Sequence, residues 1–165
     1  MSLYIGIDPG AHGAIAALDQ NGNIVAIDDM PVVKVRVGKT ERARVSAGML
    51  AELLDQTAHD DVQMVVIERV GGMTGQSASA SFTFGYGCGM IEGVLAAMQL
   101  PVAMVTPQAW KRSAGIASDK GAARECAMRL WPANARLFAR LKDDGRAEAA
   151  LLARHGWMAV ARATA

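Results

Sequence analysis

Two carboxylates interrupt stretches of sequence that are otherwise apolar and read as strands. Asp8 follows the run YIGI and directly precedes Pro9-Gly10, and Glu68 follows VVI within VQMVVIERV, residues 62–70. Burial of an unpaired carboxylate costs several kcal/mol, so such a residue requires a cation, strong hydrogen bonds or a raised pKa. A metal ion would meet this requirement at both positions.

A second acidic element lies in KDDGRAEAALLA, residues 142–153, where Asp144 and Glu148 are four residues apart and share one face of a helix. Capping and favourable charge at a helix N-terminus are the alternative for Asp143 and Asp144. The four-residue spacing differs from the three of a capping box, so a reciprocal cap leaves Glu148 unexplained. Oxygen ligands from these elements suit two hard cations such as Mg²⁺ or Mn²⁺. Such a pair of ions activates water and stabilises the leaving oxygen in phosphodiester hydrolysis.

The composition predicts one globular domain over residues 1–165, since 52% of the residues are hydrophobic and 20% are charged. The two cysteines, Cys88 and Cys126, have no metal-ligand spacing and are expected to be free thiols in a reducing compartment. The start MSLYIGIDPG does not resemble a signal peptide, and no apolar run approaches the roughly 20 residues of a membrane span. These features predict a cytoplasmic protein that has no contact with membranes.

The charge is unevenly distributed although the formal net charge is only +1. The segment 101–142 carries eight basic and two acidic residues, and a second basic cluster lies in 34–44 with five basic residues against Glu41. Its basic members are Lys34, Arg36, Lys39, Arg42 and Arg44. Such clusters are compatible with an anionic polymer as ligand, and equally with solvated faces of secondary structure.

Hydrophobic patterning and turn residues predict an α/β three-layer sandwich with a mixed sheet. The expected strands are 3–8, 13–19, 23–29, 62–70 and 101–106, of which the first three form an antiparallel meander. The expected helices are 46–58, one ending near Gln99, one capped by Thr106, 118–130 capped by Ser118 or Asp119, and 145–154. Residues 30–45 are expected to be a mobile surface loop, and 71–89 a flexible loop that leads into a helix.

The order of the motifs resembles that of the RuvC-like Holliday junction resolvases, of the ribonuclease H-like superfamily, from residue 4 to about residue 155. The motifs are IGIDPGAHGAIA, VVIERV, SFTFGYGCGMIEGVL, TPQAWKRSAGIASDKGAAR with LWP, and DDGRAEAALLA. The resemblance implies a mixed five-stranded sheet flanked by helices, cleavage of four-way DNA junctions that depends on two Mg²⁺ ions or Mn²⁺, and a homodimer. The form DGRAEA resembles the phage and prophage branch.

The resemblance also implies site residues. Asp8, Glu68, Asp144 and Glu148 correspond to the metal ligands and catalytic acids of the family. The bacterial housekeeping pattern has a further acid at the place of Gly145, for which Asp144 is the expected substitute and Asp143 the weaker candidate.

Lys111 and Lys120 match the basic positions of the family near the scissile phosphate, and Arg112, Arg124 and Phe82 complete the predicted DNA-binding set. Solvated helix lysines are the alternative for Lys111 and Lys120. Core packing is the alternative for Phe82 and Phe84 to stacking on an unpaired base. The three tryptophans, Trp110, Trp131 and Trp157, are expected in the core or at a dimer contact.

Two other functions compete with a nuclease. The first motif also occurs in actin-like and sugar-kinase ATP-binding proteins, but those folds need two domains, which 165 residues cannot supply. A junction-binding protein without catalysis is the second alternative. Four acids next to a polyanion argue against it, because a pure binder gains nothing from them.

Overall fold

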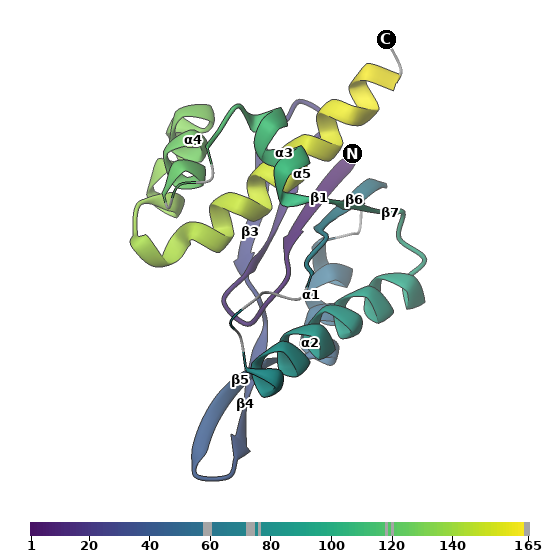
Figure 1. Ribbon diagram of the computed structural model, residues 1–165. Coiled ribbons are helices and arrows are strands. Elements are labelled where there is room, and N and C mark those ends of the chain that lie inside the picture. Colours follow the sequence, from purple (N-terminus) through teal and green to yellow (C-terminus); the bar gives the residue numbers. More distant parts are fainter. Residues whose placement is uncertain (58–60, 72–74, 76, 118, 120, 164–165) are drawn as a thin grey trace.

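The computed structural model describes residues 1–165 except 58–60, 72–74, 76, 118, 120 and 164–165. Its main sheet has five strands in the order β3-β2-β1-β6-β7, in which β1 pairs antiparallel with β2 and parallel with β6. The strands are β1 (Leu3–Asp8), β2 (Ala14–Leu18), β3 (Ile24–Asp29), β6 (Val62–Glu68) and β7 (Val102–Val105). The predicted mixed sheet, an antiparallel meander continued by parallel strands, is confirmed (Figure 1).

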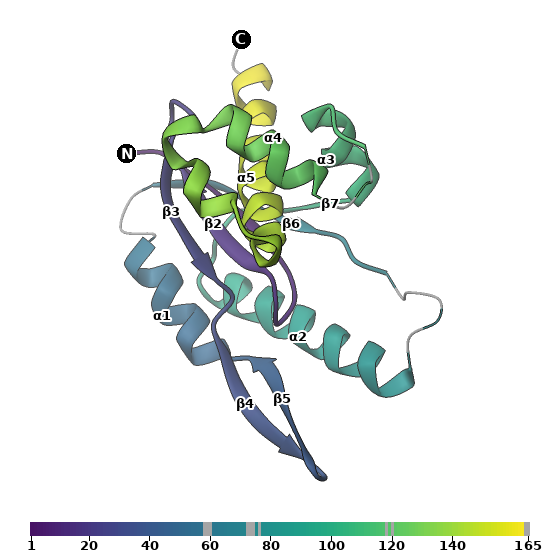
Figure 2. The same ribbon diagram turned by 90° about the vertical axis from the view of Figure 1, so that its left-hand side faces the viewer.

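Helices cover both faces of this sheet, so the fold has the three layers that the sequence predicts (Figures 1 and 2). The helices are α1 (Ala47–Thr57), α2 (Ala78–Ala97), α3 (Pro107–Ala114), α4 (Ala122–Leu130) and α5 (Asp144–Ala163), with the 3-10 helices η1 (Pro132–Phe138) and η2 (Leu141–Asp143). Side chains alternate across each strand. Ile5 and Ile7 pack with Leu50 of α1 and Ile91 of α2, whereas Val66 packs with α3, α4 and α5.

Helix α5 lies directly against β1 because glycine and alanine line the contact. A Cβ atom on Gly6 would lie 2.0 Å from the carbonyl oxygen of Ala149, and one on Gly156 would lie 2.7 Å from Val66 Cγ2. The backbone of α5 therefore approaches the sheet more closely than any larger residue at these positions would allow. This approach brings the N-terminal half of α5 to the carboxyl end of β1.

The expected mobile loop at 30–45 is wrong. These residues form a separate two-stranded antiparallel sheet of β4 (Val32–Val37) and β5 (Thr40–Val45), joined by a two-residue turn at Gly38-Lys39. Gly38 has φ +63°, as the tight hairpin turns require. Strand β4 alternates valine with Lys34 and Arg36, and in β5 Arg42 and Arg44 alternate with Ala43 and Val45. The period of two of a strand is present, but the many charges give the segment the composition of a loop.

Two helix starts also differ from the sequence prediction. Helix α2 begins at Ala78, with Ser77 as the N-cap whose hydroxyl accepts from the amide of Ala80, so a large part of 71–89 is helix rather than loop. Helix α4 begins at Ala122 after Gly121, which makes no side-chain cap; Ser118 lies outside the described residues. Thr106 caps α3 as predicted. No described helix is long and apolar enough to span a membrane.

Candidate metal centre

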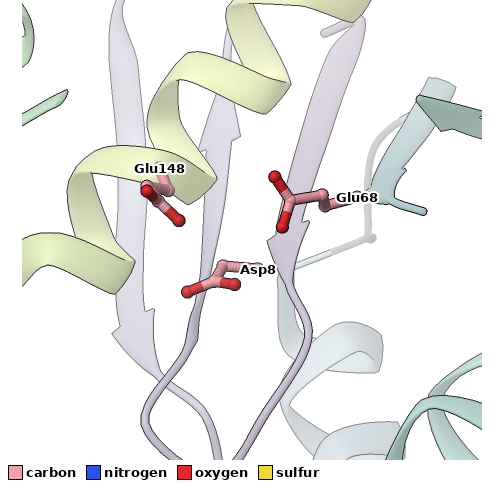
Figure 3. A group of neighbouring side chains, drawn as sticks. All are labelled: Asp8, Glu68 and Glu148. Atoms are coloured by element: carbon pink, nitrogen blue, oxygen red, sulfur yellow. The ribbon is translucent and has the colours of Figure 1, made fainter. Parts of the chain in front are cut away.

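Asp8 and Glu68 are the last residues of β1 and β6, which are parallel neighbours in the sheet. Ile7 is paired with Ile67, so the two carboxylates follow paired residues at the same end of the sheet. Both side chains point to the face that α5 covers, since Ile7 and Ile67 occupy the opposite face. Figure 3 shows the two acids turned toward one another at these strand ends.

Glu148, on the second turn of α5, completes the group (Figure 3). One carboxylate oxygen from each of Asp8, Glu68 and Glu148 lies within 4.8 Å of the other two. Gly145 permits this arrangement: a Cβ atom there would lie 2.7 Å from the carbonyl oxygen of His12 and 3.0 Å from Asp8 Oδ2. An acid at position 145, as in the housekeeping pattern, therefore has no room with α5 in this position.

The three carboxylates repel one another in a partly dry environment. Burial, followed by the charges of Glu148 and Glu68, raises the pKa of Asp8 well above its usual value. Burial and then Glu68 raise the pKa of Glu148, and the positive charge of Lys111 opposes both shifts. The negative charges of the three carboxylates are thus only partly balanced by Lys111, and a divalent cation would balance the rest. Clustered carboxylate oxygens are also the donors that hard cations prefer, so the residues fit such an ion.

Trp110 holds Glu68 in place, a role that the sequence did not reveal. Its indole Nε1 donates a hydrogen bond to Glu68 Oε1 at 2.7 Å, and its ring is only 1% exposed. The ring is in the core as predicted, but its polar atom serves the acidic group. One feature of the sequence pointed to this role. Trp110 lies on α3, a few residues after β7, and β7 is the strand next to β6, which ends in Glu68.

Lys111 lies beside the acids instead of in solvent. Its Nζ is 3.9 Å from Glu148 Oε1 and 5.2 Å from the centre of the Trp110 ring, and its side chain is 24% exposed. This position beside the acids favours the predicted phosphate-binding role over a solvated helix lysine, and that role stays a prediction. Lys120 lies outside the described residues.

Asp144 stands apart from the three-acid group, and Asp143 is occupied elsewhere. Asp144 Oδ1 accepts from Arg124 Nε at 2.6 Å, while its side chain is half exposed. Asp143 is buried and bound by the backbone amide and guanidinium of Arg140. Of the two, only Asp144 shares the cleft with Asp8 and Glu148, so it stays the predicted additional ligand.

The other predicted DNA-binding residues differ in position. Arg112 is exposed on the last turn of α3, and Arg124 is mostly covered in its pair with Asp144. Phe82 is 70% exposed and stacks on Tyr86 of the next turn of α2, with ring centroids 6.2 Å apart, so core packing is wrong for Phe82. Its contact with DNA stays a prediction.

A cleft of about 510 Å³ opens over Asp8, Asp144 and Glu148, bounded by the β1–β2 turn, α3 and the start of α5. Phe84 lines this cleft and also two neighbouring hollows, one beside Glu68 and one beside β5. The sequence indicated only that Phe84 was core or stacking. Its position instead makes it the shared wall between the acids and the surfaces on either side.

The sheet order, the covering helices and the acids at the ends of the central strands define a ribonuclease H-like fold with an acidic centre. Among solved structures, RuvC of Thermus thermophilus has this fold. In complex with a Holliday junction substrate it matches with a TM-score of 0.65 and 14% identity, over 98% of this chain and 96% of that chain. A second T. thermophilus RuvC structure gives a TM-score of 0.57 and 14% identity, over 97% and 96%. No protein-family model and no curated protein sequence matches the chain.

Proposed function

We propose that the chain, over its 165 residues, is a single nuclease domain that cuts four-way or otherwise branched DNA with divalent metal ions. The observation that carries this proposal is the group of three carboxylates, from β1, β6 and α5, within 4.8 Å of one another on a RuvC-like fold. The RuvC neighbour is in complex with a Holliday junction substrate, which supports branched DNA as the substrate class. The motif DGRAEA supports the phage and prophage branch, and the free cysteines support a cytoplasmic location.

The residues divide into ion holders and phosphate binders. Asp8, Glu68 and Glu148 would hold the ions, with Asp144 joining them for a second ion after release from Arg124. When bound, two Mg²⁺ or Mn²⁺ ions supply activation of water and stabilisation of the leaving oxygen, which gives 5′-phosphate and 3′-hydroxyl ends.

Lys111 faces the same cleft as Asp8 and Glu148, where its charge would attract the scissile phosphate and stabilise the charge that develops on it. Lys120 would bind near the same phosphate, and Arg112, Arg124 and Phe82 would contact the flanking DNA. Trp110 keeps Glu68 oriented by its indole hydrogen bond. The acids alone would repel DNA, so binding of the ions and of the substrate reinforce one another.

Two symmetric cuts across a four-way junction require two centres. We therefore propose a homodimer as the active unit, with one acidic centre in each protomer.

The test is cleavage of a labelled synthetic four-way junction by the purified protein in Mg²⁺ and, separately, Mn²⁺. Wild type should give paired nicks in opposite strands and sediment as a dimer. Asp8→Asn should cut at least about a hundredfold more slowly, because a buried ligand is lost. Asp144→Asn should retain more activity than Asp8→Asn if Asp144 serves only one ion.

Exposed Asp55 of α1 gives the matched control, since Asp55→Asn also removes one carboxylate but lies outside the cleft. An intact junction after incubation with wild type and either metal would overturn the nuclease proposal. Tight binding without cleavage would favour the non-catalytic junction binder, and metal-dependent hydrolysis of ATP would favour the actin-like alternative.

A further inference from the structure

The basic ribbon, β4 and β5 with their turn (residues 32–45), is the part of the chain that the proposed chemistry leaves unused. It projects away from the body of the protein in both views (Figures 1 and 2). Each strand has six residues, so at about 3.3 Å per residue the ribbon is roughly 20 Å long. Residues 36–42 are all exposed, while Val45 at the base is buried in the core.

Positive charge covers both faces and the tip of the ribbon. The register places Lys34 and Arg36 on one face, and Arg42 and Arg44 on the other, with Lys39 in the turn. Glu41, opposite Arg36, is the single acidic residue of 32–45, which leaves a formal charge of +4. None of the ion pairs recorded among the described residues involves a cation of this ribbon.

The ribbon leaves the body at the end of the sheet that carries the acids. Strand β3 is antiparallel to β2, which is antiparallel to β1, so β1, β3 and β6 all point the same way. The ribbon follows β3 directly, and the amide of Met30 bonds to the carbonyl oxygen of Gly13 in the β1–β2 turn at 2.9 Å. The base of the ribbon is therefore fixed beside the turn that follows Asp8.

A hollow of about 330 Å³ connects the ribbon to the catalytic cleft. Arg42 and Arg44 line it on one side and Gly10 to His12 on the other, with Phe84 of α2 as a third wall. Gly10, His12 and Phe84 also line the cleft over Asp8 and Glu148. A polymer that occupies the cleft can thus continue past Phe84 onto the arginines of β5 without leaving the surface.

We propose that the basic ribbon binds the phosphate backbone of a duplex arm of the DNA whose scissile phosphate lies in the cleft. This inference rests on the proposed function and adds the surface that holds the arm. Duplex DNA fits because it is a dense and extended polyanion, and because a two-stranded ribbon is narrow enough for its major groove, about 12 Å wide. A second copy of the chain fits poorly, since two ribbons of +4 repel one another.

The test compares two double variants that each remove two positive charges. Lys34→Gln/Arg42→Gln takes one cation from each face of the ribbon. Arg154→Gln/Arg162→Gln is the matched control on the far half of α5, away from the cleft. Binding is measured in EDTA, so that nothing is cut, on a synthetic four-way junction and on a linear duplex of the same arm sequence, across a salt series.

The ribbon variant should bind both DNAs about tenfold more weakly than wild type. Its slope of log affinity against log salt should fall by about 1.8, because each lost phosphate contact contributes about 0.9. The control variant should change affinity less than threefold.

Unchanged affinity and slope in the ribbon variant would overturn the inference, as would equal losses in both variants. A change in sedimentation of the ribbon variant would also overturn it, by making the ribbon a contact between copies. Lys39→Gln, a change at the fully solvated turn, repeats the measurement without risk to the strands. Binding is measured without cleavage, so the two proposals are tested separately. A wild-type protein that fails to cut junctions would overturn the proposed function, while the affinities of the variants would still test whether the ribbon binds DNA.

Discussion

Two adjacent residues of α3 act on two different acids of the centre. Trp110 donates to Glu68, and Lys111 lies 3.9 Å from Glu148. Both depend on one short helix that is fixed at its start by the Thr106 cap and Pro107. The orientation of one carboxylate and the charge balance of another are thus set by a single turn of helix.

Trp110→Phe should keep the core filled but leave Glu68 without its hydrogen-bond donor. We expect cleavage to fall roughly 10-fold to 100-fold and the Mg²⁺ concentration for half-maximal rate to rise, as is typical when the partner of a metal ligand is lost. Cleavage rates across a Mg²⁺ series, with the melting temperature of each protein, give the measurement.

Trp131→Phe is the matched control, because Trp131 is also buried and its Nε1 donates to the carbonyl oxygen of Gly22, away from the acids. It should lower stability by a similar amount with an unchanged Mg²⁺ requirement. If both variants shift the Mg²⁺ requirement equally, Trp110 has no positioning role.

Single residues were predictable where their chemistry conflicted with their surroundings. Asp8 and Glu68 are charges at the ends of apolar strands, and the fold brings them together with Glu148. Trp110 was not predictable, since an indole in an apolar helix is consistent with the core whether or not its N–H has an acidic partner. The pair of Asp144 with Arg124 depends on how α4 and α5 pack, which sequence spacing does not contain.

At the scale of elements, α5 controls the centre through its close approach to the sheet. Gly145 at its start faces the backbone of the β1–β2 turn, and Gly6 accepts the backbone of its middle. The position of Glu148 relative to Asp8 is a direct result of this contact. Small residues are therefore required for the position of Glu148 as well as for packing.

Gly145→Ala should displace α5, although alanine is the better helix former. The added Cβ would meet the carbonyl oxygen of His12 at 2.7 Å, so we expect a loss of about 1–3 kcal/mol in the free energy of unfolding and at least tenfold slower cleavage. Chemical denaturation and the junction assay measure the two effects.

Gly93→Ala on α2 is the control, because nothing lies within 4 Å of its added Cβ. It should raise stability by up to about 1 kcal/mol and leave cleavage unchanged. Wild-type cleavage by Gly145→Ala would show that α5 can shift without loss of the centre.

The order and type of the elements followed from hydrophobic period and turn residues, with one clear error at residues 30–45. The ribbon is buried mainly at its base, so it lacks the row of buried apolar residues by which a strand is recognised in a sequence. Its many cations also give the segment the composition of a surface loop. The start of α2 at Ala78 was not predictable within 71–89, because this segment is rich in Gly, Ser and Ala; packing of Ile91 and Leu95 in the core stabilises the helix.

For the whole molecule, the acidic centre lowers stability in the absence of a cation. The folded state raises the pKa of Asp8 through burial and through Glu148 and Glu68, so it binds the proton more tightly than the unfolded chain does. The free energy of unfolding must then fall as pH rises from the usual aspartate range through the raised value. Above the raised value this stability is fully lost.

Asp8→Asn should therefore be more stable than wild type at pH 7 in EDTA, by at least about 2 °C in melting temperature, with a difference that shrinks toward pH 4. Added Mg²⁺ should stabilise wild type more than the variant, because the ion binds the folded state. Thermal unfolding from pH 4 to 8 gives the measurement. A variant that melts below wild type at pH 7 would contradict the repulsion between these acids.

The acids come from distant parts of the chain, since Asp8 ends the first strand and Glu148 lies on the last helix. Until α5 has docked on Gly6, the chain carries two of the three clustered carboxylates and no complete ion site. Under the proposed function, copies in which α5 has not docked would keep their basic segments but lack the complete group of acids. The proposed hydrolysis would therefore depend on the contact between α5 and β1, and so on correct folding of the whole domain.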